Sequence, residues 1–110
     1  MRHWDLNELA VEAHRPDVLH SEGEGRAIAI SLPAGESMQD HQVHERSWLV
    51  VVAGRIEVEP DEGETVTAGP GHLLVFDPNE RREVRAVDES RLLLLLAPWP
   101  GQGHPSLRTA

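Results

Sequence analysis

The chain alternates between apolar and polar positions over most of its length, with a period of two from about residue 26 onward. The clearest alternation lies at 55–59, where charged residues flank Ile56 and Val58. Near-continuous apolar runs at 48–53 and 91–97 are typical of strands that are covered on both faces. We therefore predict short strands at 26–32, 48–53, 55–59, 64–67, 73–76, 82–87 and 91–97.

Turn-forming residues separate these runs, including Gly54, the segment 60–63 and Gly71. Many short strands divided by such turns indicate a β-sandwich or a β-barrel. An immunoglobulin-like sandwich usually carries two cysteines, and this chain has none. We expect an all-β jelly-roll barrel, in which two paired sheets protect each other's edges.

Three segments can be separated along the chain. Residues 1–25 form an N-terminal arm, residues 26–97 the barrel, and residues 98–110 a tail rich in proline and glycine. Within the arm, Asp5 and Glu8 have the spacing of a capping box. The apolar residues that follow at helical spacing predict a short helix over 6–13, which Pro16 would end.

Composition narrows the functions that the chain can have. The net charge is −9, and an acidic surface repels phosphate backbones, so we expect no nucleic-acid partner. The absence of cysteine excludes disulfides, thiolate metal sites and a cysteine nucleophile. No apolar run is long enough to span a bilayer and no targeting segment stands at the N-terminus, so we expect a cytoplasmic protein without a membrane partner.

The spacing of Gly35, His41, Gly54 and Gly71 resembles the paired motifs of the cupin superfamily, in its small single-domain, RmlC-like form. The resemblance covers residues 26–97 and implies a cupin-type jelly-roll β-barrel. It also implies a divalent metal inside the barrel, because such barrels usually hold one through three histidines and a glutamate.

Compared residue by residue with those motifs, the metal site of this chain is largely degenerate. His41 stands at the first histidine position, whereas Val43, Ser47 and Arg82 stand at the other three. Valine offers no donor atom, and arginine is a permanent cation without a lone pair that would repel the ion. We therefore expect no resident cofactor at the usual position. Asp77 and Asn79 replace a usual proline and glycine, and asparagine tolerates the left-handed backbone well.

The residues at these positions suggest a different ligand. Arg82, with His41 and Ser47 nearby and Leu49 and Val84 as apolar walls, would make a pocket for a small organic anion, because guanidinium groups bind carboxylates through paired hydrogen bonds. The alternative is that Arg82 forms an ion pair with Glu36 or Glu80 and that the pocket is filled.

A shifted metal site is a second hypothesis. A small β-bulge would bring His41, His44 and Glu83 together, a donor set that suits Zn, Fe, Mn or Ni in an enzyme of the dioxygenase or isomerase type. Regular alternation would instead direct His44 and Glu83 outward. Whether the protein is an enzyme stays open at this point.

A third hypothesis is a structural or regulatory homodimer with no ligand. Small cupins resemble one another in pairing through strand edges. Such a dimer would cover the edge of the apolar strand at 48–53, and the arm with Trp4 would reach across to the partner.

Overall fold

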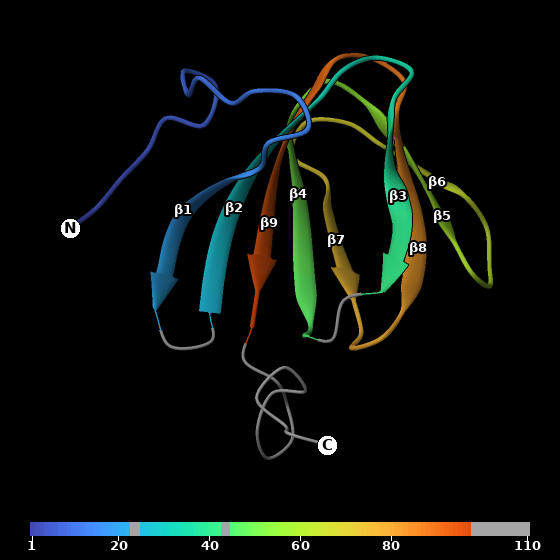
Figure 1. Cartoon of the computed structure of the whole chain (residues 1–110). Coiled ribbons are helices and arrows are strands. Elements are labelled where there is room, and N and C mark those ends of the chain that lie inside the picture. Colours follow the sequence, from blue (N-terminus) through green and yellow to red (C-terminus); the bar gives the residue numbers. More distant parts are fainter. Residues whose placement is uncertain (23–24, 43–44, 98–110) are drawn as a thin grey trace.

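The structure, a computed structural model, describes residues 1–22, 25–42 and 45–97, and within them nine strands and no helix occur. That part of the chain therefore contains no helix able to cross a membrane. The strands form two antiparallel sheets that face each other, as Figure 1 shows. In chain order they are β1 (Asp17–Glu22), β2 (Gly25–Leu32), β3 (Ser37–Gln42), β4 (Ser47–Ala53), β5 (Ile56–Pro60), β6 (Val66–Ala68), β7 (Leu73–Phe76), β8 (Arg81–Ala86) and β9 (Ser90–Leu96).

The larger sheet, sheet A, has the strand order β1-β2-β9-β4-β7, and the smaller one, sheet B, has the order β3-β8-β5-β6. This arrangement confirms the prediction of an all-β jelly-roll barrel. Each of the seven predicted strands occurs: 73–76 has the predicted bounds, and the ends of the others move by a residue or two. Two strands were missed, β1 and β3. Their sequences, DVLHSE and SMQDHQ, are mostly polar and show little of the alternation on which the prediction relied. Residues 17–22, placed in the arm by sequence, thus extend sheet A.

The helix predicted over 6–13 is wrong. The amide of Glu8 donates to the carbonyl of Asp5 at 3.1 Å, which makes one turn that does not continue. The guanidinium of Arg91, on β9, instead donates to the carbonyls of Leu6 and Leu9 at 2.8 and 2.7 Å. A helix would need these carbonyls for its own hydrogen bonds, and a helix this short is marginal without a packed face. Arg91 therefore fastens the arm to sheet A in a non-helical form.

The core lies between the two sheets and takes alternate residues from each. Its fully buried members include Leu49 and Val51 of β4, Ile56 of β5 and Leu92 of β9. The intervening residues of each strand point away from the core, and the two sheets differ in what they place there.

The outer face of sheet B is charged. On β8, Arg81, Glu83 and Arg85 are exposed and alternate with buried residues. Arg85 lies directly opposite Glu57 of β5 and donates a hydrogen bond to its carboxylate, which raises the pKa of Arg85. This face is suited to contact with water.

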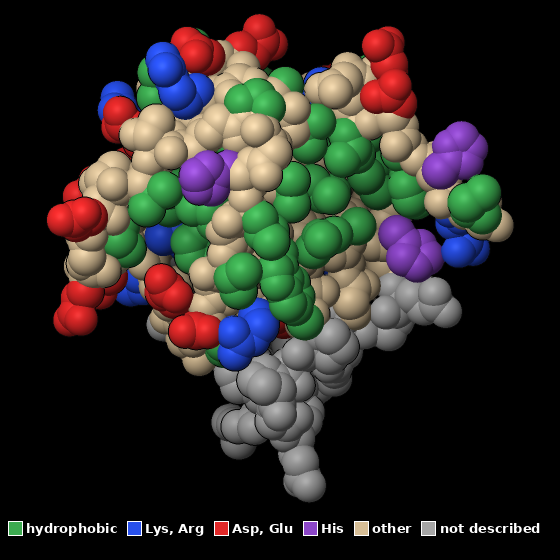
Figure 2. All heavy atoms as spheres, turned by 180° about the vertical axis from the view of Figure 1, so that it is seen from behind, with side chains coloured by type: hydrophobic (Ala, Val, Ile, Leu, Met, Phe, Trp, Pro, Cys, Tyr) green, Lys and Arg blue, Asp and Glu red, His purple; other side chains and the backbone are tan. Residues whose placement is uncertain are grey.

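The outer face of sheet A is apolar. Figure 2, which views the molecule from behind, shows hydrophobic side chains gathered over the middle of this face. The strand register places them in two rows that cross β2, β9, β4 and β7. One row is Leu93, Val50 and Leu73, which continues to the buried Ala29, and the other is Ala27, Leu95, Trp48 and Val75. β4 is an interior strand of this sheet that pairs with β9 on one side and β7 on the other, so it has no free edge for the edge-paired dimer expected of the strand at 48–53.

Gly54 ends β4 in a turn where only glycine fits. Its φ is +85°, a left-handed conformation that side chains other than glycine rarely adopt. A Cβ atom at this position would lie 2.3 Å from the carbonyl oxygen of Glu89 and 2.5 Å from the hydroxyl of Ser90. The turn after β4 therefore packs directly against the turn that leads into β9. Gly35 has a similar φ of +83°, but a Cβ there would meet nothing within 4 Å.

These two glycines give a matched test of the fold. Gly35→Ala is expected to lower the free energy of unfolding by about 1–2 kcal/mol, because alanine is strained in a left-handed conformation. Gly54→Ala is expected to cost about 2–5 kcal/mol, because the overlap with Glu89 and Ser90 adds to the same strain. Urea unfolding followed by circular dichroism would measure both. An equal decrease in the free energy of unfolding for the two variants would show that the two turns do not pack as described.

Candidate functional site

Arg82 breaks the pattern of its strand, because it is a charged residue at a core position. β8 alternates strictly, and Arg82 shares the inner side with Val84 and Ala86. Only 3% of its surface is exposed. The guanidinium carbon lies 4.5 Å from the centre of the Phe76 ring, so the cation stacks on an aromatic face inside the barrel. Arg82 also takes part in further interactions.

Ser47 is brought to the same place from the opposite sheet. It lies directly across from Phe76 in the β4–β7 ladder, and both residues are buried. The Ser47 side chain is completely shielded from solvent, and its hydroxyl oxygen has no hydrogen-bond partner among the residues that the structure describes. Phe76 therefore contacts Arg82 of sheet B and neighbours Ser47 of sheet A, so the two polar residues that the sequence singled out converge on one ring.

His41 is positioned by a β-bulge in β3. Met38 lies opposite Val84 and His41 lies opposite Arg82, while the register shifts between these two pairs. Gln39 and Asp40 together face a single residue of β8, which is the arrangement of a bulge. His41 therefore occupies the backbone position paired with Arg82. The contacts of its side chain lie outside the described part of the structure.

Leu49 and Val84 are core residues that lie next to the polar residues. Leu49 follows Ser47 by two positions on β4, and Val84 follows Arg82 by two positions on β8. Both belong to the hydrophobic core, with 1% and 2% of their surfaces exposed. The interior thus passes from a polar layer at Ser47, Phe76 and Arg82 to a purely apolar layer beside it.

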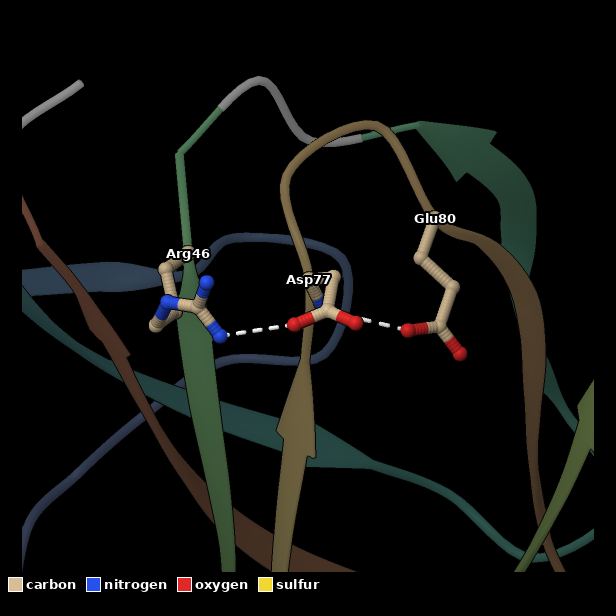
Figure 3. A network of polar contacts seen from close by, with 3 residues as sticks. All are labelled: Arg46, Asp77 and Glu80. Carbon is tan, nitrogen blue, oxygen red and sulfur yellow. Dashed lines mark hydrogen bonds and ion pairs between the residues drawn. The ribbon is translucent and has the colours of Figure 1, made fainter. Parts of the chain in front are cut away.

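The two acids suggested as partners of Arg82 have other neighbours. An Oε2 atom of Glu36 lies 3.0 Å from Nε2 of His14 in the arm. Glu80 accepts a hydrogen bond from the backbone amide of Asp77 at 3.0 Å, and the Asp77 carboxylate accepts one from Arg46 at 2.7 Å (Figure 3). Glu80 thereby closes the turn after β7, in which Asn79 adopts the left-handed conformation with φ +66°.

The residues that the structure describes do not fit a divalent metal at the position usual for this kind of barrel. A stacked guanidinium occupies one expected ligand position and a neutral hydroxyl another, so the site presents positive charge where a metal needs lone pairs. For the shifted set, Glu83 is exposed on the outer face of β8, and His44 lies outside the described residues. Among residues 1–22, 25–42 and 45–97, no group of three histidines or carboxylates is placed to hold a metal.

Sequence reasoning missed two residues of this region. Phe76 is the only phenylalanine of the chain, and its part as a platform for Arg82 depends on how the sheets face each other. Glu45 is 4% exposed, and its carboxylate lies 3.6 Å from the guanidinium of Arg26. Strand alternation gave no signal for it, because Glu45 lies in the bend before β4 and not in the strand itself.

Comparison with known proteins identifies the family. A family model described as the cupin domain matches residues 28–98, which is more than half of the chain. The chain therefore belongs to the cupin domain family. No curated protein matches the chain.

Solved structures of similar fold come from diverse microbes. An RmlC-like cupin protein from Desulfovibrio desulfuricans is 24% identical with a TM-score of 0.78, covering 89% of this chain and 97% of that one. A protein from Rhizobium leguminosarum is 22% identical with a TM-score of 0.75, and the match covers 89% of this chain and 97% of that one. An RmlC-like cupin family protein from Methanocaldococcus jannaschii, with a double-stranded β-helix fold, is 18% identical with a TM-score of 0.72, covering 84% and 89%. At these identities the likeness shows the fold alone.

The unbonded hydroxyl of Ser47 leads to a prediction about stability. A buried hydroxyl without a partner costs about 1–3 kcal/mol of desolvation, so Ser47→Ala is expected to raise the free energy of unfolding by about 1 kcal/mol. Ser90 provides the control, because it is equally buried but its hydroxyl lies 2.8 Å from the carbonyl of Asp88. Ser90→Ala is expected to lower the free energy of unfolding by about 1 kcal/mol. Parallel urea titrations would measure both changes. A lower free energy of unfolding for both variants would mean that Ser47 makes a structural hydrogen bond.

Proposed function

We propose that this cupin binds a small organic anion inside its barrel and that Arg82 is the charged anchor. The observation that carries the proposal is a guanidinium that is 3% exposed, stacked on Phe76, in the layer that also holds the unbonded hydroxyl of Ser47. Burying a cation is costly, and proteins do so where its charge has a purpose such as holding an anion.

The stacked geometry suits the recognition of a carboxylate. The guanidinium carbon lies over the face of the Phe76 ring, whereas a carboxylate is bound by the N–H groups through two parallel hydrogen bonds. A cation–π contact uses none of these N–H donors, so the two interactions are compatible on one side chain. Because the guanidinium cannot lose its proton, the anchor would keep its charge at every physiological pH.

Ser47 supplies the second part of the proposed site. Its hydroxyl is a donor and an acceptor that no residue in the described part of the chain satisfies, and it lies beside the same ring. A ligand oxygen would satisfy it and remove the cost of leaving it unbonded. The His41 position, paired with Arg82 across the β3–β8 ladder, is the place for a further polar contact.

The apolar residues that we propose as walls of the site limit the kind of anion that it can bind. Leu49 and Val84 adjoin the polar layer and offer no hydrogen-bonding side-chain atoms. The proposed ligand is therefore a small carboxylate with an apolar part, rather than a phosphate-rich nucleotide.

A thermal-shift screen against a panel of small carboxylates tests this proposal. A carboxylate present at ten times its Kd is expected to raise the Tm by about 6 °C for a domain of this size. Arg82→Gln is expected to abolish that increase. Arg81→Gln is the matched control, because it removes the same charge from the exposed neighbouring position of β8 and should leave the increase intact.

Two further measurements keep the test decisive if Arg82→Gln folds poorly. Ser47→Ala keeps the buried cation, and it is expected to reduce the ligand-induced increase without abolishing it. Elemental analysis of protein purified without chelators or a histidine tag addresses the metal-dependent alternative. Stoichiometric Fe, Mn, Ni or Zn that is lost on His41→Ala would contradict the proposal, and so would a Tm that no carboxylate changes.

A further inference from the structure

The inner face of sheet A carries a second arginine at the level of Ser47. The strand register places Arg26 of β2 opposite Leu96 of β9, and it places Leu96 opposite Ser47 of β4. Arg26 precedes Ile28 by two positions, and Ile28 packs against the core, so alternation directs Arg26 to the same inner side. Arg26 therefore belongs to the row that continues through Ser47 to Phe76.

The guanidinium of Arg26 is paired with a buried carboxylate. Its Nη2 atom lies 3.6 Å from Oε2 of Glu45, whose side chain is only 5% exposed, whereas the Arg26 side chain is 42% exposed. Arg26 lies on β2 and Glu45 comes just before β4, so the pair spans β9, which lies between these two strands (Figure 1). Glu45 takes part in further interactions as well.

Glu45 lies close to the proposed anion site. Two residues of fully extended chain span at most about 7 Å, so the backbone of Glu45 is within about that distance of Ser47. Ser47 lies across from Phe76, on which Arg82 stacks. Acidic side chains are seldom fully buried, and this chain buries one on the Ser47 side of the layer that holds the buried cation.

We infer that Glu45 makes the anion site selective for monocarboxylates over dicarboxylates. The inference rests on the anion site proposed above and adds the class of its ligand. Inside the barrel, the far end of a ligand anchored on Arg82 lies either against Leu49 and Val84 or along the row toward Glu45. A second carboxylate is unfavourable in the first place, because it would leave water without a partner. It is unfavourable in the second place, because the charge of Glu45 repels it.

Arg26 does not offset this repulsion, because Glu45 already engages its guanidinium. If the acid were replaced by an uncharged residue, Arg26 would be a cation two strands from Ser47, which is about 10 Å across the sheet. A dicarboxylate could then use it as a second anchor. Removing the acid should therefore admit dicarboxylates, whereas removing the arginine should repel them more strongly.

Isothermal titration calorimetry at neutral pH with pentanoate and glutarate would test the inference. The two acids have the same carbon chain, and glutarate has a carboxylate where pentanoate has its terminal methyl group. Wild-type protein is expected to bind pentanoate at least about tenfold more tightly than glutarate. Glu45→Gln is expected to tighten the binding of glutarate by about tenfold and to change that of pentanoate by less than about threefold. Glu45→Asp keeps the charge and should keep the preference, which a merely structural role of the side chain would not predict.

Three further variants keep the test decisive if Glu45→Gln folds poorly. Arg26→Gln removes the counter-charge of the acid and is expected to raise the preference for pentanoate. The double variant Arg26→Gln with Glu45→Gln is expected to gain less affinity for glutarate than Glu45→Gln alone, because the second anchor is missing. Glu59→Gln is the matched control, since it removes the same charge from an exposed position of β5 and should leave the preference unchanged.

The outcomes separate this inference from the proposed function. Equal affinities of wild-type protein for pentanoate and glutarate would overturn the inference and leave the anion site in place. A wild-type preference in Glu45→Gln, or the same loss of preference in Glu59→Gln, would have the same meaning. A wild-type Tm that no carboxylate changes would overturn the proposed function, and this inference with it.

Discussion

The stacking of Arg82 on Phe76 is the interaction on which the interior of this protein depends. It places a permanent cation between two sheets whose other contacts are almost entirely apolar. In a barrel whose family resemblance leads one to expect a metal, the guanidinium provides fixed positive charge without any ion. The layer around it, in which Ser47 lies across from Phe76, is where we propose that an anion binds.

Much of the fold could be predicted from the sequence, because most strands bury one face and so show an alternation that can be read directly. β1 and β3 could not, because their sequences are mostly polar, whereas β7, which also lies at a sheet edge, is apolar and was predicted. The wrong helix has a different cause. Asp5 and Glu8 carry a local helix signal, but Arg91, more than eighty residues away, takes the carbonyls that a helix would use. A local pattern cannot reveal a competitor that arrives through tertiary structure.

The candidate site was predictable to a similar degree. Alternation with Val84 and Ala86 directed Arg82 inward, and the structure agrees. Its contact with Phe76 joins the two sheets, so it depends on the distance between them and on the length of the arginine side chain. The pattern of residues along a single strand does not contain this information. The β-bulge in β3 is a related case: it decides that His41 pairs with Arg82, and the sequence could suggest such a bulge but not locate it.

The most direct test of the central claim is to observe Arg82 itself during a ligand titration. Each of the ten arginines has one Nε–H group, which nuclear magnetic resonance can follow in labelled protein. When a carboxylate that raises the Tm is added, the account predicts that the Nε–H signal of Arg82 moves with saturation while the signals of exposed arginines such as Arg81 and Arg85 stay in place. An Arg82 signal that does not respond, while the protein still binds the carboxylate, would contradict it.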